Sequence, residues 1–232
     1  MLIFAHRGAS AEAPENTLRA IELALAQQVD GIEIDVHQVE RELVVIHDRW
    51  VHRTTNGSGQ LSDYRFSELR QLDAGQGQRV PTLWEVMQLI DGQCRLNIEV
   101  KGIQDVDLLF SYIDKACQEL HFSQEQFILS SFDHHLLAAI KHQRPSLLLG
   151  ALTASKPLDY AAFAERLQAY SVNADVTFLD HNFVKDAHLR GLKVFVYTVD
   201  ERDDLALLAD WQVDGVFCNA PAKARALLQA KG

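Results

Sequence analysis

Short apolar runs alternate along the chain with segments whose apolar residues recur at spacings of three and four. The runs predict strands at 2–5, 31–36, 95–100, 127–131, 146–151, 171–175, 193–198 and 213–218. The periodic segments predict helices at 17–28, 82–91, 104–119, 134–143, 158–169, 182–190, 202–210 and 221–230. Strands that alternate with helices in this way indicate a parallel sheet with helical crossovers.

Residues that favour helix ends agree with these boundaries. Asn16 is expected to cap the first helix, Pro81-Thr82 to open the second, and Gly191 to close the sixth. Eight strand–helix units favour a closed α/β barrel, the (β/α)8 TIM barrel, over a doubly wound sheet. No strong internal repeat or linker indicates a second full domain, so we expect one domain over residues 1–232.

A ninth apolar run, Leu43-Val44-Val45-Ile46, falls outside the alternation. It follows the strand at 31–36 after only a short polar turn near Glu40-Arg41, which is too short for a parallel crossover. The two segments should therefore form an antiparallel hairpin above the barrel rim. Such a hairpin returns His47 to the level of the acidic residues at the end of the second strand.

The segment that follows, at about 49–80, is polar and rich in turn residues. It is too small to build an independent core. We expect a small insertion after the second strand that caps the mouth of the barrel, where substrate selectivity often resides.

Composition narrows the class of protein. The net charge of −10 argues against a nucleic-acid partner or an anionic membrane surface, whose footprint is a basic patch. No apolar stretch is long enough for a membrane span or stable membrane insertion, and no signal peptide is expected at the start. Three widely separated cysteines without CxxC spacing predict neither a disulfide framework nor a zinc site, and favour a reduced, cytoplasmic location.

Ionisable residues gather at the ends of predicted strands, which is where barrel enzymes assemble an active site. They are His6 and Arg7 after the first strand, Glu33, Asp35 and His37 in the second, His47 after the hairpin, and Glu99 and Lys101 in the third.

The carboxylates among them predict a metal site. Strand side chains alternate between faces, so Glu33 and Asp35 point the same way, as do Glu99 and Lys101. If both sets face the barrel mouth, three carboxylates converge, and their repulsion requires a neutralising cation. Oxygen ligands suit Mg²⁺ or Ca²⁺ better than zinc. The alternative, in which buried carboxylates only pair with Lys or Arg, is disfavoured because two histidines lie beside them.

The remaining residues predict chemistry on an anion. The bidentate guanidinium of Arg7 suits a phosphate, and Gly8 permits the tight turn that presents it. Lys101 adds a second cation, and His6 and His47 are candidates for proton transfer. His37 is left with three roles: metal ligand, support for Glu33, or packing in the hairpin.

Two aromatic residues are candidates for the wall of a substrate pocket. Phe132 follows the strand at 127–131, and Tyr197 lies near the end of the strand at 193–198. Packing in the core is the competing interpretation for both.

Taken in series, the motifs resemble those of the glycerophosphodiester phosphodiesterase family over nearly the whole chain. They are His6-Arg7-Gly8, Pro14-Glu15-Asn16-Thr17, Glu33-Ile34-Asp35-Val36-His37, His47-Asp48, Arg53-Thr54-Thr55-Asn56-Gly57, Glu99-Val100-Lys101 and Ser131-Phe132-Asp133.

The resemblance implies a TIM barrel that hydrolyses glycerophosphodiesters, such as glycerophosphocholine or glycerophosphoethanolamine, to an alcohol and glycerol 3-phosphate. It implies a divalent cation on Glu33, Asp35 and Glu99. It also implies that His6 and His47 are the acid–base pair. Arg7 and Lys101 would then bind the phosphate, with Phe132 and Tyr197 as expected substrate contacts.

Three segments depart from the family pattern. They are the hairpin turn Val39-Glu40-Arg41-Glu42, the end of the seventh strand at Tyr197-Thr198-Val199-Asp200, and the end of the eighth at Phe217-Cys218-Asn219-Ala220-Pro221. All lie away from the catalytic and metal positions, so they bear on substrate fit and insertion geometry more than on the reaction.

Several alternatives stay open at the level of sequence. A phospholipase that acts on lipid diesters would use a similar barrel, but the polar segment at 49–80 offers no clear apolar rim. A non-catalytic phosphate-ester binding protein would show erosion of the five catalytic and metal positions, which are all present. The alcohol group, the choice between Mg²⁺ and Ca²⁺, the nucleophile (glycerol 2-hydroxyl or water), the acid histidine and the oligomeric state are not predicted.

Overall fold

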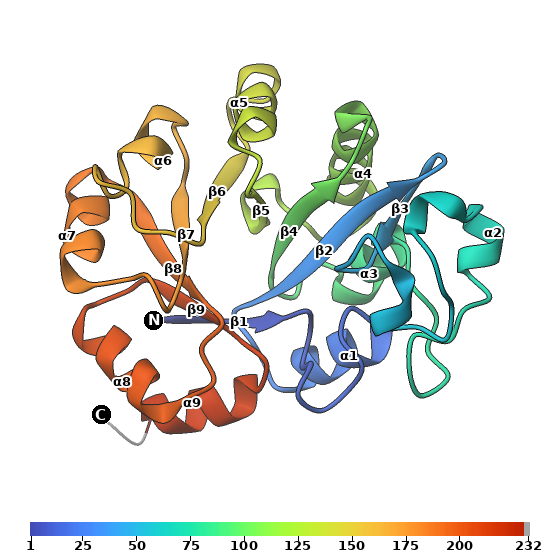
Figure 1. Cartoon of the computed structure of the whole chain (residues 1–232), viewed down its shortest axis with the longest axis horizontal. Coiled ribbons are helices and arrows are strands. Elements are labelled where there is room, and N and C mark those ends of the chain that lie inside the picture. The colour runs from blue at the N-terminus through green and yellow to red at the C-terminus, as the bar shows by residue number, and fades with distance from the viewer. Residues whose placement is uncertain (230–232) are drawn as a thin grey trace.

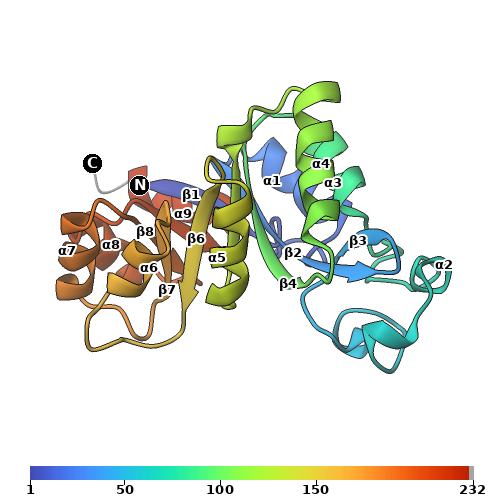
Figure 2. The same ribbon diagram turned by 90° about the horizontal axis from the view of Figure 1, so that it is seen from above.

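Eight parallel strands close into a barrel with helices around its outside, as the alternation of strands and helices predicts (Figures 1 and 2). The structure, a computed structural model, describes residues 1–229. The barrel strands are β1 (Leu2–His6), β2 (Gly31–Val39), β4 (Arg95–Gly102), β5 (Phe127–Ser131), β6 (Leu148–Thr153), β7 (Ser171–Asp175), β8 (Lys193–Tyr197) and β9 (Gly215–Cys218). Their order is β1-β9-β8-β7-β6-β5-β4-β2, and pairing of β1 with β2 closes the ring. The predicted (β/α)8 TIM barrel is confirmed.

Each predicted helix has a counterpart within residues 1–229. They are α1 (Leu18–Ala26), α3 (Leu83–Ile90), α4 (Val106–Glu119), α5 (His134–Gln143), α6 (Ala162–Arg166), α7 (His181–Leu189), α8 (Arg202–Asp210) and α9 (Pro221–Gln229). Helix α6 is much shorter than its predicted range because Tyr160 and Gln168 adopt positive φ angles, 47° and 51°, which end an α-helix. The predicted end of the last helix, residue 230, lies outside the described residues. None of these helices combines the length and the apolar content that a membrane span requires.

The second and sixth predicted helices have the end signals that the sequence predicts. Thr82 caps α3, accepting a hydrogen bond from the backbone of Glu85, whose side chain bonds back to Thr82. Gly191 follows the end of α7 with φ of 77°, a left-handed conformation that glycine adopts without strain. These two boundaries are confirmed.

The predicted cap of the first helix is wrong by one residue. Thr17 caps α1, and its hydroxyl accepts a hydrogen bond from the backbone of Ala20 at 3.3 Å. Asn16 has a positive φ of 56°, and its side-chain amide instead donates to Asp35 at 2.9 Å. The loop after β1 therefore uses Asn16 to hold a carboxylate of the barrel, and leaves capping to its neighbour.

Aromatic side chains fill the inside of the barrel toward the amino ends of its strands and leave the mouth, at the carboxyl ends, open. Phe4 packs against Phe195 and Phe217 with ring centroids 5.2 and 5.1 Å away, and Ile128 completes this buried cluster. Gly31 makes room for it, because a Cβ there would meet the Phe4 ring at 2.3 Å. The barrel is therefore a packed core below its mouth, and the carboxyl ends of its strands are the end at which such barrels bind ligands.

The ninth apolar run forms the predicted hairpin. Strand β3 (Glu42–Val45) pairs antiparallel with β2, with Val36 opposite Val45. The chain then forms two 3₁₀ turns, at Val51–Arg53 and Leu61–Asp63, and the short helix α2 (Phe66–Leu69) before reaching α3. This segment lies to one side of the barrel with β3 (Figures 1 and 2). Its apolar residues pack on those of the hairpin in a small cluster of their own: Val39, Val44, Ile46, Val51, Leu61, Leu69, Ala74 and Val80.

Candidate active site

A cavity of about 460 Å³ opens at the carboxyl ends of the barrel strands. Of the nine site residues predicted from the sequence, all but Asp35 line it: His6, Arg7, Glu33, His47, Glu99, Lys101, Phe132 and Tyr197. Asp35 is fully buried directly beside them. The structure thus brings together residues that are spread over most of the chain.

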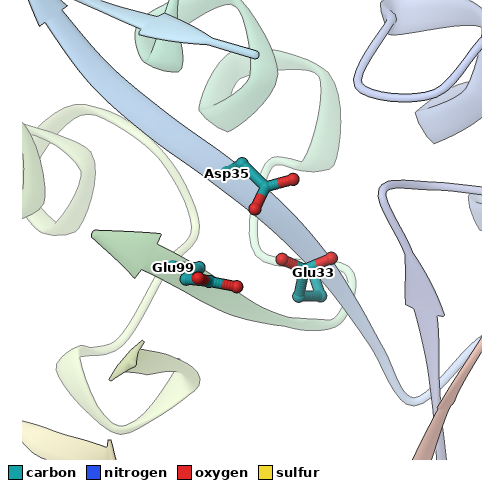
Figure 3. Close-up of side chains that lie close together, drawn as sticks. All are labelled: Glu33, Asp35 and Glu99. Carbon is teal, nitrogen blue, oxygen red and sulfur yellow. The ribbon is translucent and has the colours of Figure 1, made fainter. Parts of the chain in front are cut away.

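Three carboxylates converge at one side of this cavity (Figure 3). Glu33 and Asp35 come from β2, and Glu99 comes from β4, where it stands opposite Asp35 in the parallel pairing. Oxygen atoms of the three lie within 4.8 Å of one another, and Glu33 and Asp35 are almost entirely buried. Burial, and then the charge of Asp35, raises the pKa of both Glu33 and Glu99. The arrangement is therefore unfavourable for three negative charges unless a cation joins them.

The surrounding charges and hydrogen bonds leave room for such a cation. Arg7 Nε lies 3.3 Å from Asp35, and Lys101 Nζ lies 2.6 Å from Glu99 and 3.3 Å from Asp35. Two positive side chains thus face three carboxylates. Among residues 1–229, no group donates a hydrogen bond to the buried Glu33 Oε1, and the buried Asp35 Oδ1 has Lys101 Nζ at 3.3 Å as its ion-pair partner. A buried carboxylate oxygen without a hydrogen bond, in a site with a net negative charge, fits a hard divalent ion, Mg²⁺ or Ca²⁺.

His6 is held in one tautomer by residues from the far end of the chain. Asn219 donates its amide to Asp200 Oδ2 at 2.6 Å, which turns its carbonyl oxygen toward His6 Nδ1, at 2.8 Å. Ser10 donates to the same oxygen at 2.9 Å. His6 Nδ1 must therefore carry the proton, and Nε2 is the basic nitrogen. Burial, and then the charge of Arg7, lowers the pKa of His6, so the imidazole is neutral at pH 7.

His47 has a different environment, with a carboxylate on one side and a cation on the other. Its Nδ1 lies 2.5 Å from Asp48 Oδ1, and its Nε2 lies 3.1 Å from Lys101 Nζ. Because an ammonium can only donate, Nε2 accepts from Lys101 and Nδ1 donates to Asp48. Burial would raise the pKa of Asp48, but hydrogen bonds from Arg53 and His47 outweigh it and lower the pKa to about 2. Asp48 is thus a permanent negative charge that can stabilise a protonated His47.

His37 contacts the backbone of the other histidine of the hairpin. Its Nε2 lies 3.0 Å from the carbonyl oxygen of His47. Gly102 makes this position possible, since a Cβ there would lie 2.7 Å from His37 Nδ1. Of the roles left open by the sequence, the structure therefore favours a packing role in the hairpin, and this contact also fixes the position of His47.

A bridge of charged residues joins the loop after β1 to the segment at 49–80. Glu15 accepts from Arg7 Nη1 at 2.7 Å and from both terminal nitrogens of Arg53, at 2.9 and 2.8 Å. Arg53 Nε also donates to Asp48. The bridge therefore connects the loops that carry His6 and His47. The sequence motifs contain Glu15, Asp48 and Arg53 but assign them no role. The prediction that the strand ends at 197–200 and 217–221 lie away from the catalytic positions is wrong, because Asn219 Oδ1 lies 2.8 Å from His6 Nδ1 and Asp200 orients Asn219.

Replacing Glu15 with glutamine is expected to destabilise the protein at neutral pH. Burial would raise the pKa of Glu15, but its hydrogen bonds with Arg53 and Arg7 lower it from 4.5 to about 2. A carboxyl whose pKa is depressed in the folded state stabilises the fold above its unfolded pKa. We expect Glu15→Gln to lower the free energy of unfolding at pH 7 by about 1–3 kcal/mol.

Urea denaturation of the wild type and of Glu15→Gln at several pH values tests this prediction. As pH falls below about 4.5 toward about 2, the contribution of Glu15 is lost, so the wild type and the variant should converge in unfolding free energy. A difference that is the same at pH 7 and at about pH 3 would contradict the ion-pair account.

Two aromatic rings, after β5 and at the end of β8, also line the cavity. Phe132 is 48% exposed, and its ring stands nearly perpendicular to that of Tyr197, at 87° with centroids 6.1 Å apart. The Tyr197 hydroxyl donates to the carbonyl oxygen of Thr153 at 2.9 Å, which anchors the ring. Phe132 is therefore not a core residue, and both rings are available to a bound molecule.

Comparisons with known proteins agree with this geometry. Residues 6–223 match the model of the glycerophosphoryl diester phosphodiesterase family. A glycerophosphodiester phosphodiesterase of Caldanaerobacter subterraneus subsp. tengcongensis is 37% identical over 230 residues, which cover 95% of this chain and 94% of that protein. One of Bacillus subtilis is 31% identical over 247 residues, covering 95% of this chain and 84% of that protein. A phosphodiesterase of Oleispira antarctica, solved in complex with its product sn-glycerol-3-phosphate, superposes with a TM-score of 0.88 at 29% identity, covering 99% and 97% of the two chains.

Proposed function

The chain belongs to the glycerophosphoryl diester phosphodiesterase family, and on that premise we propose that it hydrolyses small glycerophosphodiesters to an alcohol and sn-glycerol 3-phosphate with a divalent cation. It is thus an enzyme, a phosphoric diester hydrolase. Glycerophosphocholine and glycerophosphoethanolamine are the proposed substrates. The observation that carries the proposal is the convergence of three carboxylates and two differently held histidines on one cavity.

The phosphate is assigned to the cationic side of the cavity. Arg7 and Lys101 both line it, and a guanidinium can bind two phosphoryl oxygens at once. Arg7 has a positive φ of 59°, which is unfavourable for a residue with a Cβ, and Gly8 follows at 80°. Gly8 cannot be replaced without movement, since a Cβ there would lie 2.6 Å from the backbone of Ala20. The strained turn supports a fixed position for the guanidinium.

Glu33, Asp35 and Glu99 would hold the cation. When bound, the ion supplies positive charge to a phosphoryl oxygen and acidifies the attacking hydroxyl. Neutral His6 takes the proton of that hydroxyl at Nε2, while Asn219 keeps the other ring nitrogen protonated. As the acid, His47 gives a proton from Nε2 to the leaving alkoxide, which requires Lys101 to donate to the phosphate instead of to that nitrogen; Asp48 stabilises the protonated ring at Nδ1. The two environments thus support a division of roles, with His6 as base and His47 as acid.

The proposal also assigns roles to parts of the chain away from the chemistry. The described residues, 1–229, would act as one catalytic domain. In it, the segment at about 49–80 lies beside the barrel and carries Arg53 to the loops of both histidines, and its role as a cap over the mouth stays a prediction. The cytoplasmic location expected from the cysteines stays a prediction.

Product analysis tests which bond is cleaved. With glycerophosphocholine as substrate, we expect sn-glycerol 3-phosphate and choline, identified by ³¹P NMR and a coupled dehydrogenase assay. Phosphocholine as the product would contradict the proposal. Cleavage of phosphatidylcholine in vesicles with no turnover of the soluble diester would instead favour the phospholipase alternative.

If His6 is the base, moving the negative charge of Asp200 onto residue 219, next to His6, should change the pH dependence of kcat/KM. In the double variant Asp200→Asn/Asn219→Asp, the hydrogen bond between the two side chains is retained with its direction reversed. The negative charge then lies directly against His6 Nδ1 and raises the pKa of His6. The acidic limb of the kcat/KM profile should move to higher pH by about one unit.

The pH profile of the double variant separates this role from a purely structural one. A variant that loses activity by the same factor at all pH values, with the acidic limb of its kcat/KM profile unmoved, would show that His6 is not the group that must be deprotonated.

A further inference from the structure

The cavity has a second side that the proposed chemistry does not use. In the ring of eight strands, β7 stands opposite β2, and β8 stands opposite β4. The carboxylates and Lys101 belong to β2 and β4, whereas Asp175 and Tyr197 end β7 and β8 and pair in register. A diester whose phosphate lies at Arg7 and Lys101 therefore extends one of its arms toward β7 and β8.

Asp175 places a negative charge on this second side. It lines the cavity and is partly exposed there. One of its oxygens accepts a hydrogen bond from the backbone of Thr177 at 2.8 Å. In the part of the chain that the structure describes, the carboxylate has no ion-pair partner. Its charge, after burial, also raises the pKa of Tyr197. The carboxylate is thus an anion on the surface of a substrate cavity, and no ion pair within residues 1–229 neutralises its charge.

Aromatic surface adjoins that carboxylate. Tyr197 is the register partner of Asp175, and Phe132 stands at 87° to the Tyr197 ring. Two rings at a right angle offer a face and an edge to one bound group, and ring faces attract cations. A carboxylate beside such rings repels an anion, accommodates a neutral alcohol without a charge pair, and attracts an ammonium or trimethylammonium group.

We propose that Asp175, Phe132 and Tyr197 form a subsite for the alcohol of the diester and select a cationic alcohol, choline or ethanolamine, over a neutral one such as glycerol. The inference rests on the proposed function, because it concerns the alcohol of the same substrate. The phosphate is negative and this head group is positive, so the phosphate is attracted to Arg7 and Lys101 and the head group to Asp175.

The test compares kcat/KM for glycerophosphocholine and glycerophosphoglycerol, both of which release glycerol 3-phosphate. The wild type should prefer glycerophosphocholine by about tenfold or more. Asp175→Asn, which keeps the shape and removes the charge, should lower this ratio by about tenfold. Phe132→Leu, a second variant at an exposed position, should lower it by a few-fold, with a larger effect on choline than on ethanolamine substrates.

Asp203→Asn, at the exposed start of α8, is the matched control and should leave the ratio unchanged. Equal kcat/KM for both substrates in the wild type would overturn the inference while leaving the diesterase intact. An unaltered preference in Asp175→Asn that remains folded would also overturn it. Failure to release glycerol 3-phosphate from either substrate would overturn the proposed function itself.

Discussion

Replacing either His6 or His47 with alanine is expected to lower kcat by about 10²–10⁴-fold, with little change in the fold. Each variant loses one of the two proposed proton-transfer groups. The remaining histidine cannot replace the missing one, because the two side chains have different environments. His6 is neutral and bonded to an amide oxygen, whereas His47 is bonded to an ionised carboxylate. The loss should appear in kcat more than in KM, since the phosphate contacts proposed for Arg7 and Lys101 would remain.

The measurement is steady-state kinetics on glycerophosphocholine with circular dichroism and a melting curve for each variant. His135→Ala is a suitable control, because His135 is exposed on α5 and, among residues 1–229, it makes hydrogen bonds through its backbone alone. A near-normal kcat in either active-site variant would remove that histidine from the mechanism.

Replacing Asp35 with asparagine is expected to abolish tight binding of the divalent cation. Asp35 shares β2 with Glu33 and stands opposite Glu99 on β4, and oxygen atoms of the three lie within 4.8 Å of one another. Asparagine has nearly the same size but removes the charge, and Asn16 and Arg7 can no longer pair with a carboxylate there. With the wild type, a cation at about 100 times its Kd should stabilise the fold by about 2.7 kcal/mol.

Titration calorimetry and melting curves with Mg²⁺ and Ca²⁺ measure this directly, independently of activity. The cation should raise the Tm of the wild type and leave that of Asp35→Asn unchanged. Glu119→Gln, at the end of α4 and away from the cavity, controls for the loss of one acidic residue. An equal rise in Tm in Asp35→Asn would show that the cation binds elsewhere.

The sequence predicts the barrel well because its signals are local. Buried strands appear in the sequence as short apolar runs. The hairpin is predicted from a turn that is too short for a parallel crossover, and the antiparallel pairing of Val36 with Val45 confirms it. The same alternation places Glu33 and Asp35 on one face. Helix α6 was predicted too long because no residue type marks the positive φ of Tyr160 or Gln168.

The support around the site could not be predicted in the same way. His6 depends on Asn219, 213 residues away, and the direction of that hydrogen bond depends in turn on Asp200. Asparagine is a residue type that favours helix caps, but the fold turns the side chain of Asn16 toward Asp35. Periodicity reports which face a side chain occupies, whereas these contacts depend on how loops from distant parts of the chain meet.

The most direct test of the central claim is release of sn-glycerol 3-phosphate from glycerophosphocholine by the wild type and by Glu99→Ala, with Mg²⁺, with Ca²⁺ and with EDTA. We expect release by the wild type with at least one of the two cations, no release above background with EDTA, and a loss of several orders of magnitude in Glu99→Ala with either ion. Undiminished release with EDTA, or by folded Glu99→Ala, would contradict a cation-dependent diesterase built on these three carboxylates.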